Sequence, residues 1–217
     1  MTRPQGDLER QARDFAAEIT GLLNKTVTHG IRLSSKMDRH GSAIIRYWGN
    51  SPNGLDDLIP LTISQKPARL GLRILHTLTL DDESKYLRNT QSAYALATAD
   101  GEAILTYDFV RPAPNVYPEA HLHIDGESAS LQRLLDLSGQ TERTARRLHL
   151  PVGGRRFRPC LEDIIEFCVS EGLVDYHAGW EDVLSEARSR FHLRQLKAAV
   201  RRCPEAAAEA LQEAGWG

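Results

Sequence analysis

Between residues 26 and 125 the chain alternates short β-rich runs with turn residues, and this pattern constrains the fold more than any other feature. Gly, Pro, Asn and Asp separate the runs, which is typical of strands joined by tight turns. Residues 99–102, Ala-Asp-Gly-Glu, have the composition of a hairpin turn. Strands so closely spaced in the sequence pair antiparallel, because parallel pairing needs long crossover connections. The expected strands are Thr26–Leu33, Ala43–Trp48, Ile59–Ser64, Gly71–Leu80, Ser92–Thr98, Ala103–Phe109 and Ala120–Asp125.

Helical periodicity flanks this region on both sides. Apolar side chains recur at helical spacing over residues 7–24 and again in four segments of the C-terminal part. We therefore predict a single α+β domain over residues 1–217, with a sheet-rich part at 26–127 and a helical part at 128–217. The sheet is expected to have six or seven mostly antiparallel strands, with one helix before it and three or four after it. The expected C-terminal helices are Ser128–Leu137, Pro159–Gly172, residues 180–202 and Pro204–Gly215.

The most chemically distinctive segment contains His121-Leu122-His123. On a strand alternate residues share a face, so His121, His123 and Asp125 are expected on one side. Two such imidazoles can serve as a metal-free acid–base pair, because histidine titrates near neutral pH. With Arg111 nearby to hold phosphate, that pair suits phosphodiester cleavage, and it needs no cofactor. Two other interpretations stay open: a divalent metal held by His121, His123 and Glu127, or two solvent-facing histidines without a role.

The neighbouring strand adds a resemblance to a known family. Tyr107-Asp108, followed by Pro118-Glu119-Ala120-His121-x-His123, resembles the outline of small prokaryotic toxins of the TumE-like kind. The resemblance covers only residues 107–123 of the 217. It implies an RNase-like hydrolase of a bacterial toxin type, with RNA or a nucleotide as substrate. Tyr107 and Asp108 would then orient a histidine or assist it.

A second resemblance concerns metal binding. The spacing His121-x-His123-x-x-x-Glu127 resembles the first metal motif of cupins. Asn115 and Leu134 stand where that motif has glycine, so the flanking pattern departs from the family. The resemblance implies a cupin-like metal-binding protein, which is a further alternative function.

Charge is segregated in the last third of the chain, although the net charge is only −2. Residues 143–158 carry six cations and no acid, 159–187 carry eight acids and no Lys or Arg, and 188–202 carry six cations and no acid. Within the last block Arg190, Arg194, Lys197 and Arg201 form one helical stripe. These blocks predict either a non-enzymatic module that docks a partner protein, such as an antitoxin, or helices that neutralise one another.

The segment Gly153–Pro159 is a candidate phosphate-binding loop. Its two glycines permit backbone conformations that aim N–H groups at an anion, and a helix N-terminus follows it. Together with Arg111, the candidate phosphate-binding residues are Arg155, Arg156 and Arg158. Alternatively the loop is structural, with Glu162 and Asp163 paired to Arg155 or Arg158.

Other classes of protein are excluded at this level. No apolar run approaches the about 20 residues of a membrane span, and the N-terminus lacks the apolar core of a signal peptide. The three cysteines form no Cys-x-x-Cys motif, which argues against a zinc ribbon or a redox pair. We expect a cytoplasmic protein with reduced thiols and no membrane partner.

Overall fold

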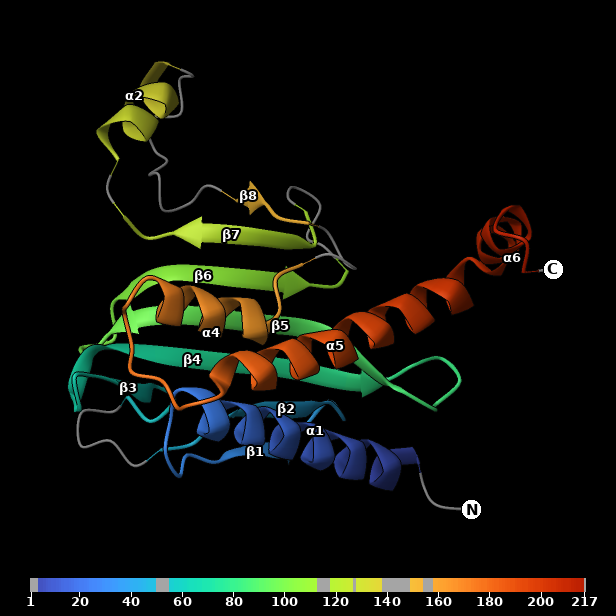
Figure 1. The fold of residues 1–217 in the computed structure, drawn as a ribbon, viewed down its shortest axis with the longest axis horizontal. Helices are drawn as coiled ribbons and strands as arrows, with labels where there is room; N and C mark the ends of the chain where they lie inside the picture. The colour runs from blue at the N-terminus through green and yellow to red at the C-terminus, as the bar shows by residue number, and fades with distance from the viewer. Residues whose placement is uncertain are drawn as a thin grey trace.

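An eight-stranded antiparallel sheet forms the centre of the fold, with helices packed on one side of it (Figure 1). The computed structural model describes residues 4–49, 55–112, 118–126, 128–137, 149–153 and 158–216. The helices are α1 (Pro4–Thr26), α2 (Ala129–Leu137), α4 (Leu161–Ser170), α5 (Trp180–Arg202) and α6 (Pro204–Glu213). The strands are β1 (Leu33–Met37), β2 (Ala43–Tyr47), β3 (Ile59–Ile63), β4 (Lys66–Leu80), β5 (Leu87–Thr98), β6 (Ala103–Val110), β7 (Ala120–Ile124) and β8 (Leu150–Pro151).

The sheet runs in the order β1-β2-β4-β5-β6-β7-β8, and β3 pairs with one end of the long strand β4. Every pairing among the described strands is antiparallel. One helix precedes the sheet, and the other helices follow its seventh strand. The predicted α+β class and antiparallel sheet are therefore confirmed.

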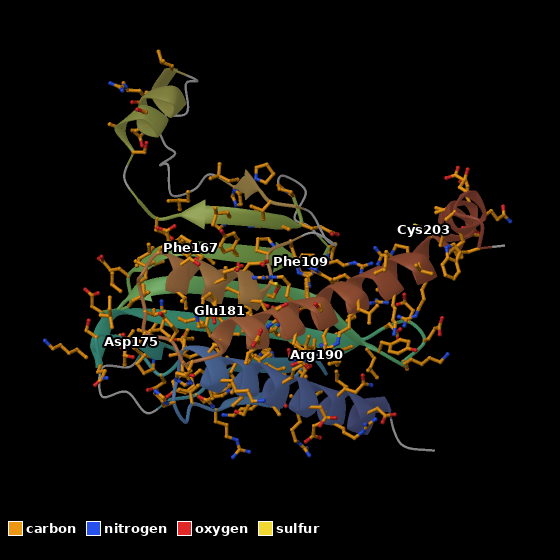
Figure 2. All side chains as sticks on the ribbon, in the orientation of Figure 1. Phe109, Phe167, Asp175, Glu181, Arg190 and Cys203 are labelled. Atoms are coloured by element: carbon orange, nitrogen blue, oxygen red, sulfur yellow. The ribbon has the colours of Figure 1, made fainter. Side chains whose placement is uncertain are left out.

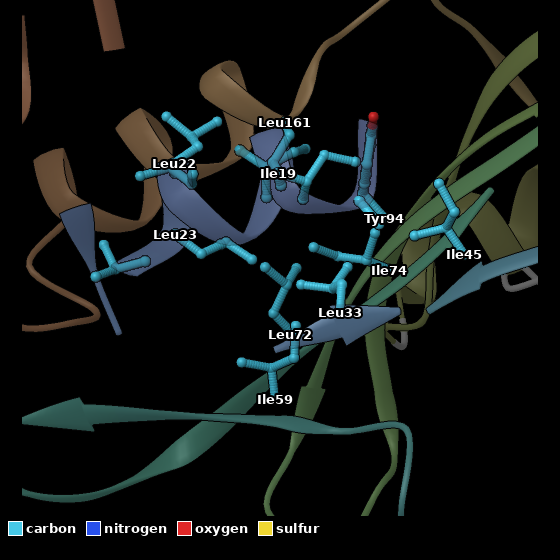
Figure 3. Packing of buried hydrophobic residues seen from close by; sticks show 14 of the residues in the cluster. Ile19, Leu22, Leu23, Leu33, Ile45, Ile59, Leu72, Ile74, Tyr94 and Leu161 are labelled. Atoms are coloured by element: carbon cyan, nitrogen blue, oxygen red, sulfur yellow. The ribbon is translucent and has the colours of Figure 1, made fainter. Parts of the chain in front are cut away.

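Helix α1 supplies much of the core. Leu8, Ala12, Ala16, Ile19 and Leu23 recur every three or four residues and are each at most 5% exposed. They pack with α4 and α5 against the apolar side chains of β1, β2, β4 and β5. Figure 3 shows α1 residues facing strand residues of this cluster, together with Leu161 from α4.

The predicted strand Thr26–Leu33 is wrong, because helix α1 continues through Thr26 and strand β1 begins only at Leu33. The side chain of Asn24 explains the difference. Its Nδ2 donates to the carbonyl of Ile31, and its Oδ1 accepts from the backbone N–H of the same residue. Asn24 thereby ties the connecting segment back to the last turn of the helix, and residues 27–32 do not enter the sheet.

The two faces of the sheet differ in what covers them. Helices α1, α4 and α5 lie together on one face, which we call the helix-covered face (Figure 1). Side chains alternate between the faces along each strand, so Tyr107 and Phe109 of β6 lie on the helix-covered face and Asp108 lies on the other. Burial agrees, since Phe109 is 3% exposed and Tyr107 packs against the core cluster. We call the opposite face the open face.

Candidate functional site

Strand β7 places His121 and His123 together on one face of the sheet, as the alternation predicts, and that face is the open face. In the antiparallel register with β6, His121 lies opposite Asp108 and His123 lies opposite Thr106. Residues paired in this way point to the same face of a sheet. The register therefore brings Asp108 beside the two histidines.

Strand β8 adds a third histidine. Leu150 pairs with Leu122 and Pro151 pairs with His121, so His149 lies next to His123 on the same face. The ring centroids are 5.0 Å apart for His121–His123, 4.9 Å for His121–His149 and 4.6 Å for His123–His149. One nitrogen from each ring lies within 4.8 Å of the corresponding nitrogens of the other two. We call these three residues the histidine cluster.

His121 is the most constrained member of the cluster. The residue is only 3% exposed, and its ring nitrogen Nδ1 lies 2.9 Å from the carbonyl oxygen of Pro118. A carbonyl oxygen can only accept, so Nδ1 carries the proton and donates it. In the neutral ring Nε2 then holds a lone pair, which is the form that a metal ion or an incoming proton requires.

Asp108 lies beside the histidine cluster but is not one of the residues whose ligand atoms lie within 4.8 Å of one another. Its Oδ2 is 3.6 Å from Nε2 of His123, at the outer limit of an ion pair. Burial raises the pKa of this carboxyl group, and the charges of His121 and His123 oppose that rise. A carboxylate in this position can hold the imidazole of His123 in one orientation.

Two of the other predicted site residues, Tyr107 and Arg158, lie on the opposite face of the sheet from this cluster. Tyr107 lies on the helix-covered face, where burial and the charge of Asp163 raise its pKa. The guanidinium of Arg158 lies 4.3 Å from the ring centre of Phe109, also on the helix-covered face, beside a small pocket. Arg111 follows β6, and its charge helps to lower the pKa of Asp82, with Arg88 the larger cause. Arg155, Arg156 and Glu127 lie outside the described residues.

Sequence reasoning missed His149. The only local signal is the alternation Leu148-His149-Leu150, which matches Leu122-His123-Ile124 in pattern. Only Leu150 of that run belongs to the short strand β8, in a Gly- and Arg-rich stretch between two predicted helices.

Several described residues of the charge blocks form ion pairs within the fold. Arg188 of α5 donates to Asp163 at 3.0 Å and to Glu166 at 2.5 Å, both on α4. Further along α5, Arg194 contacts Glu18 of α1 at 2.8 Å. Arg190, labelled in Figure 2, lies 3.8 Å from the same carboxylate. The segregated charges thus serve in part to join α5 to its two neighbouring helices.

No protein-family model, curated protein or solved structure matches this chain. Among the described residues, no helix combines the length and apolar content that crossing a membrane requires.

Proposed function

We propose that the histidine cluster binds one divalent transition-metal ion and that the protein is a metal-dependent hydrolase acting on a phosphodiester, such as RNA or a nucleotide. The observation that carries this proposal is the convergence of three imidazole nitrogens within 4.8 Å of one another. Neutral imidazole is a preferred ligand of Zn²⁺ and related ions, and three protein ligands leave a coordination position for water. Coordination of one ion would draw these nitrogens closer together than they lie in this structure.

The surroundings of the cluster support metal binding. His121 already directs its Nδ1 proton to a backbone carbonyl, which is the arrangement that orients metal-binding histidines in many proteins. Asp108 stands in the corresponding place beside His123. All three histidines belong to or adjoin paired strands, so the backbone fixes their relative positions.

The chemistry follows from the open coordination position. A metal-bound water has a pKa near 7 in such sites, compared with about 16 in bulk, and it supplies hydroxide at neutral pH. An ion held by His121, His123 and His149 would supply this hydroxide as the nucleophile: its oxygen would bond to phosphorus as the bond to the leaving oxygen breaks, and the leaving oxygen would take a proton from solvent. Asp108 acts as a positioning residue that orients His123.

A second candidate follows from the contact between Asp108 and His123. In a metal-free mechanism, His121 and His123 exchange protons with the phosphodiester and Asp108 orients the second imidazole. This version uses the same residues but gives His149 no role in chemistry.

Isothermal titration of chelator-treated protein with Zn²⁺, Mn²⁺ and Ni²⁺ tests the proposal. We expect one bound ion per chain, and its affinity falls in His149→Ala by more than the roughly 10–100-fold that loss of an outer partner causes. The matched control is His29→Ala, because Nε2 of His29 lies 3.1 Å from Nε2 of His177 in an exposed pair that could itself take a metal. Unchanged binding in His149→Ala contradicts the proposal.

Hydrolysis of bis(p-nitrophenyl) phosphate separates the two candidates. The metal-dependent mechanism predicts that chelation abolishes turnover and that adding metal restores it. Turnover that survives chelation, survives His149→Ala and disappears in His121→Ala favours the metal-free pair instead.

A further inference from the structure

The open face carries a second polar cluster, at the opposite edge of the sheet from the histidines. Lys36 of β1 and Arg46 of β2 lie on this face, and Trp48 follows directly after β2. Nζ of Lys36 lies 3.6 Å from the centre of the Trp48 ring, and the guanidinium carbon of Arg46 lies at the same distance. We call these three residues the cationic cluster.

Among the residues that the structure describes, the cationic cluster has no carboxylate partner, and two of its buried N–H groups have no acceptor. In the part of the chain that the structure describes, no carboxylate pairs with Lys36 or Arg46. Nε of Arg46 and Nε1 of Trp48 are buried and have no hydrogen-bond acceptor among the described residues. Buried donors without acceptors are costly, and two like charges on one ring add to the cost. A multiply charged anion with several oxygens relieves both costs together.

Strand register places this cluster in line with the histidine cluster. Arg46 pairs with Leu75, Leu75 with Ala93, and Ala93 with Asp108, which in turn lies opposite His121. These residues form one row across the open face. With strands about 4.8 Å apart, the row from β2 to β7 spans about 19 Å. Only Leu75 and Ala93 separate Arg46 from Asp108, so the row carries no charged side chain between the cationic cluster and the edge of the histidine cluster, where Asp108 lies.

We propose that the cationic cluster is a phosphate subsite for a single-stranded oligonucleotide that lies across the open face, with another of its phosphates at the histidine cluster. The inference rests on the proposed function for the substrate's second contact, because that contact is the hydrolytic centre. A single phosphate group is too small to reach both ends of the row, whereas a nucleic acid strand carries a phosphate at every nucleotide. Each diester phosphate of such a strand carries one negative charge on two non-bridging oxygens, so neighbouring phosphates together supply the charge and the acceptors that Lys36, Arg46 and Trp48 need.

Fluorescence anisotropy with a labelled single strand of about ten nucleotides tests the inference. The titration uses wild-type protein in chelator, so that binding is measured without metal or cleavage. In Lys36→Gln/Arg46→Gln we expect the dissociation constant to rise about ten-fold or more. The slope of log affinity against log salt should become shallower by about 1 to 2, as loss of two phosphate contacts requires.

The matched control is Arg10→Gln/Arg13→Gln on α1, which removes two exposed cations from the other side of the molecule. It should leave the salt slope unchanged. Lys36→Gln alone alters only an exposed side chain, so it reports on the subsite even where the double variant folds poorly. An equal loss in the control, unchanged binding in both Lys36 variants, or no binding by the wild type overturns the inference.

Two further measurements assign the outcome. Oligoglutamate of matched charge should compete weakly with the oligonucleotide, and equal competition contradicts a phosphate subsite. Metal titration of Lys36→Gln/Arg46→Gln should match the wild type. If Lys36→Gln/Arg46→Gln binds metal normally and binds the oligonucleotide as tightly as the wild type does, the subsite is rejected and the proposed function stands. If the wild type binds no metal while Lys36→Gln/Arg46→Gln binds the oligonucleotide more weakly than the wild type does, the proposed function alone is rejected.

Discussion

Histidines on the two faces of the sheet have opposite environments. His76 of β4 lies on the helix-covered face, is 2% exposed, and has its Nε2 3.4 Å from the hydroxyl of Tyr94. The rings of Phe15 and Tyr94 meet it edge-on. Burial lowers the pKa of His76 to about 3, and the charge of Arg158 acts in the same direction. On the open face, by contrast, three imidazoles lie within 5.0 Å of one another.

This difference shows that the face, more than the residue type, determines what a histidine does here. On the helix-covered face the ring is an apolar packing element that stays neutral at any physiological pH. On the open face, one nitrogen from each ring of the histidine cluster lies within 4.8 Å of the other two, beside the carboxylate of Asp108. Substitutions on the helix-covered face should therefore change stability, and substitutions on the open face should change binding.

The largest effect is expected from the helix-covered core. Leu23 of α1 is fully buried, and Leu23→Ala should lower the free energy of unfolding by about 2–5 kcal/mol, because it removes apolar contacts and leaves a cavity. Urea unfolding measures this change. Thr106→Ala on the open face, opposite His123, is the comparison and should cost about 1 kcal/mol or less. Equal losses in the two variants would erase the distinction between the faces.

The burial of His76 should make the free energy of unfolding depend on pH in the acid range. The pKa of this residue is lower in the folded protein than the ordinary value of 6.5, so the unfolded chain binds more protons below that pH. Stability from this residue is therefore complete above about pH 6.5 and is lost as pH falls toward 3, by about 2 kcal/mol between pH 6.5 and 4.5. Urea unfolding at these two pH values should show a smaller difference in His76→Gln than in the wild type. His192→Gln, at an exposed position on α5, should leave the difference unchanged.

Asp108 and Tyr107 are neighbours on β6 that point to opposite faces, and they offer the sharpest local comparison. Asp108→Asn should weaken metal binding at least about ten-fold, or about 1.4 kcal/mol, because His123 loses the carboxylate that orients it. Tyr107→Phe should leave the metal affinity unchanged. Isothermal titration of metal into each variant distinguishes them. A larger loss of affinity in Tyr107→Phe would mean that the helix-covered face of β6, and not the open face, binds the metal.

The sheet and half of the site follow from local sequence pattern. Turn residues and β-rich runs predict the antiparallel sheet, and two-residue periodicity places His121 and His123 together. The same periodicity separates Tyr107 from Asp108, so a dipeptide motif cannot supply both side chains to one face.

Longer-range pairing was not accessible from the sequence. His149 reaches the cluster only through the register of β8 with β7, and 25 residues separate it from His123 along the chain. Likewise, nothing local indicates that Arg46 shares a row with His121, because that alignment is set by four successive strand pairings. At Thr26–Leu33 the side chain of Asn24 overrides β-rich composition through its two hydrogen bonds to Ile31.

The smallest effect is expected where α5 meets α1. Arg194 donates to both carboxylate oxygens of Glu18, at 2.9 and 2.8 Å, yet its side chain is 53% exposed. Exposed pairs of this kind contribute little, so a double-mutant cycle of Arg194→Gln and Glu18→Gln should give a coupling energy below about 1 kcal/mol that salt reduces further. Metal and oligonucleotide affinities should not change, because the pair lies on the helix-covered side. A coupling well above this value, or a loss of oligonucleotide binding, would mean that the stripe on α5 has a role beyond joining two helices, as a docking or phosphate-binding surface requires.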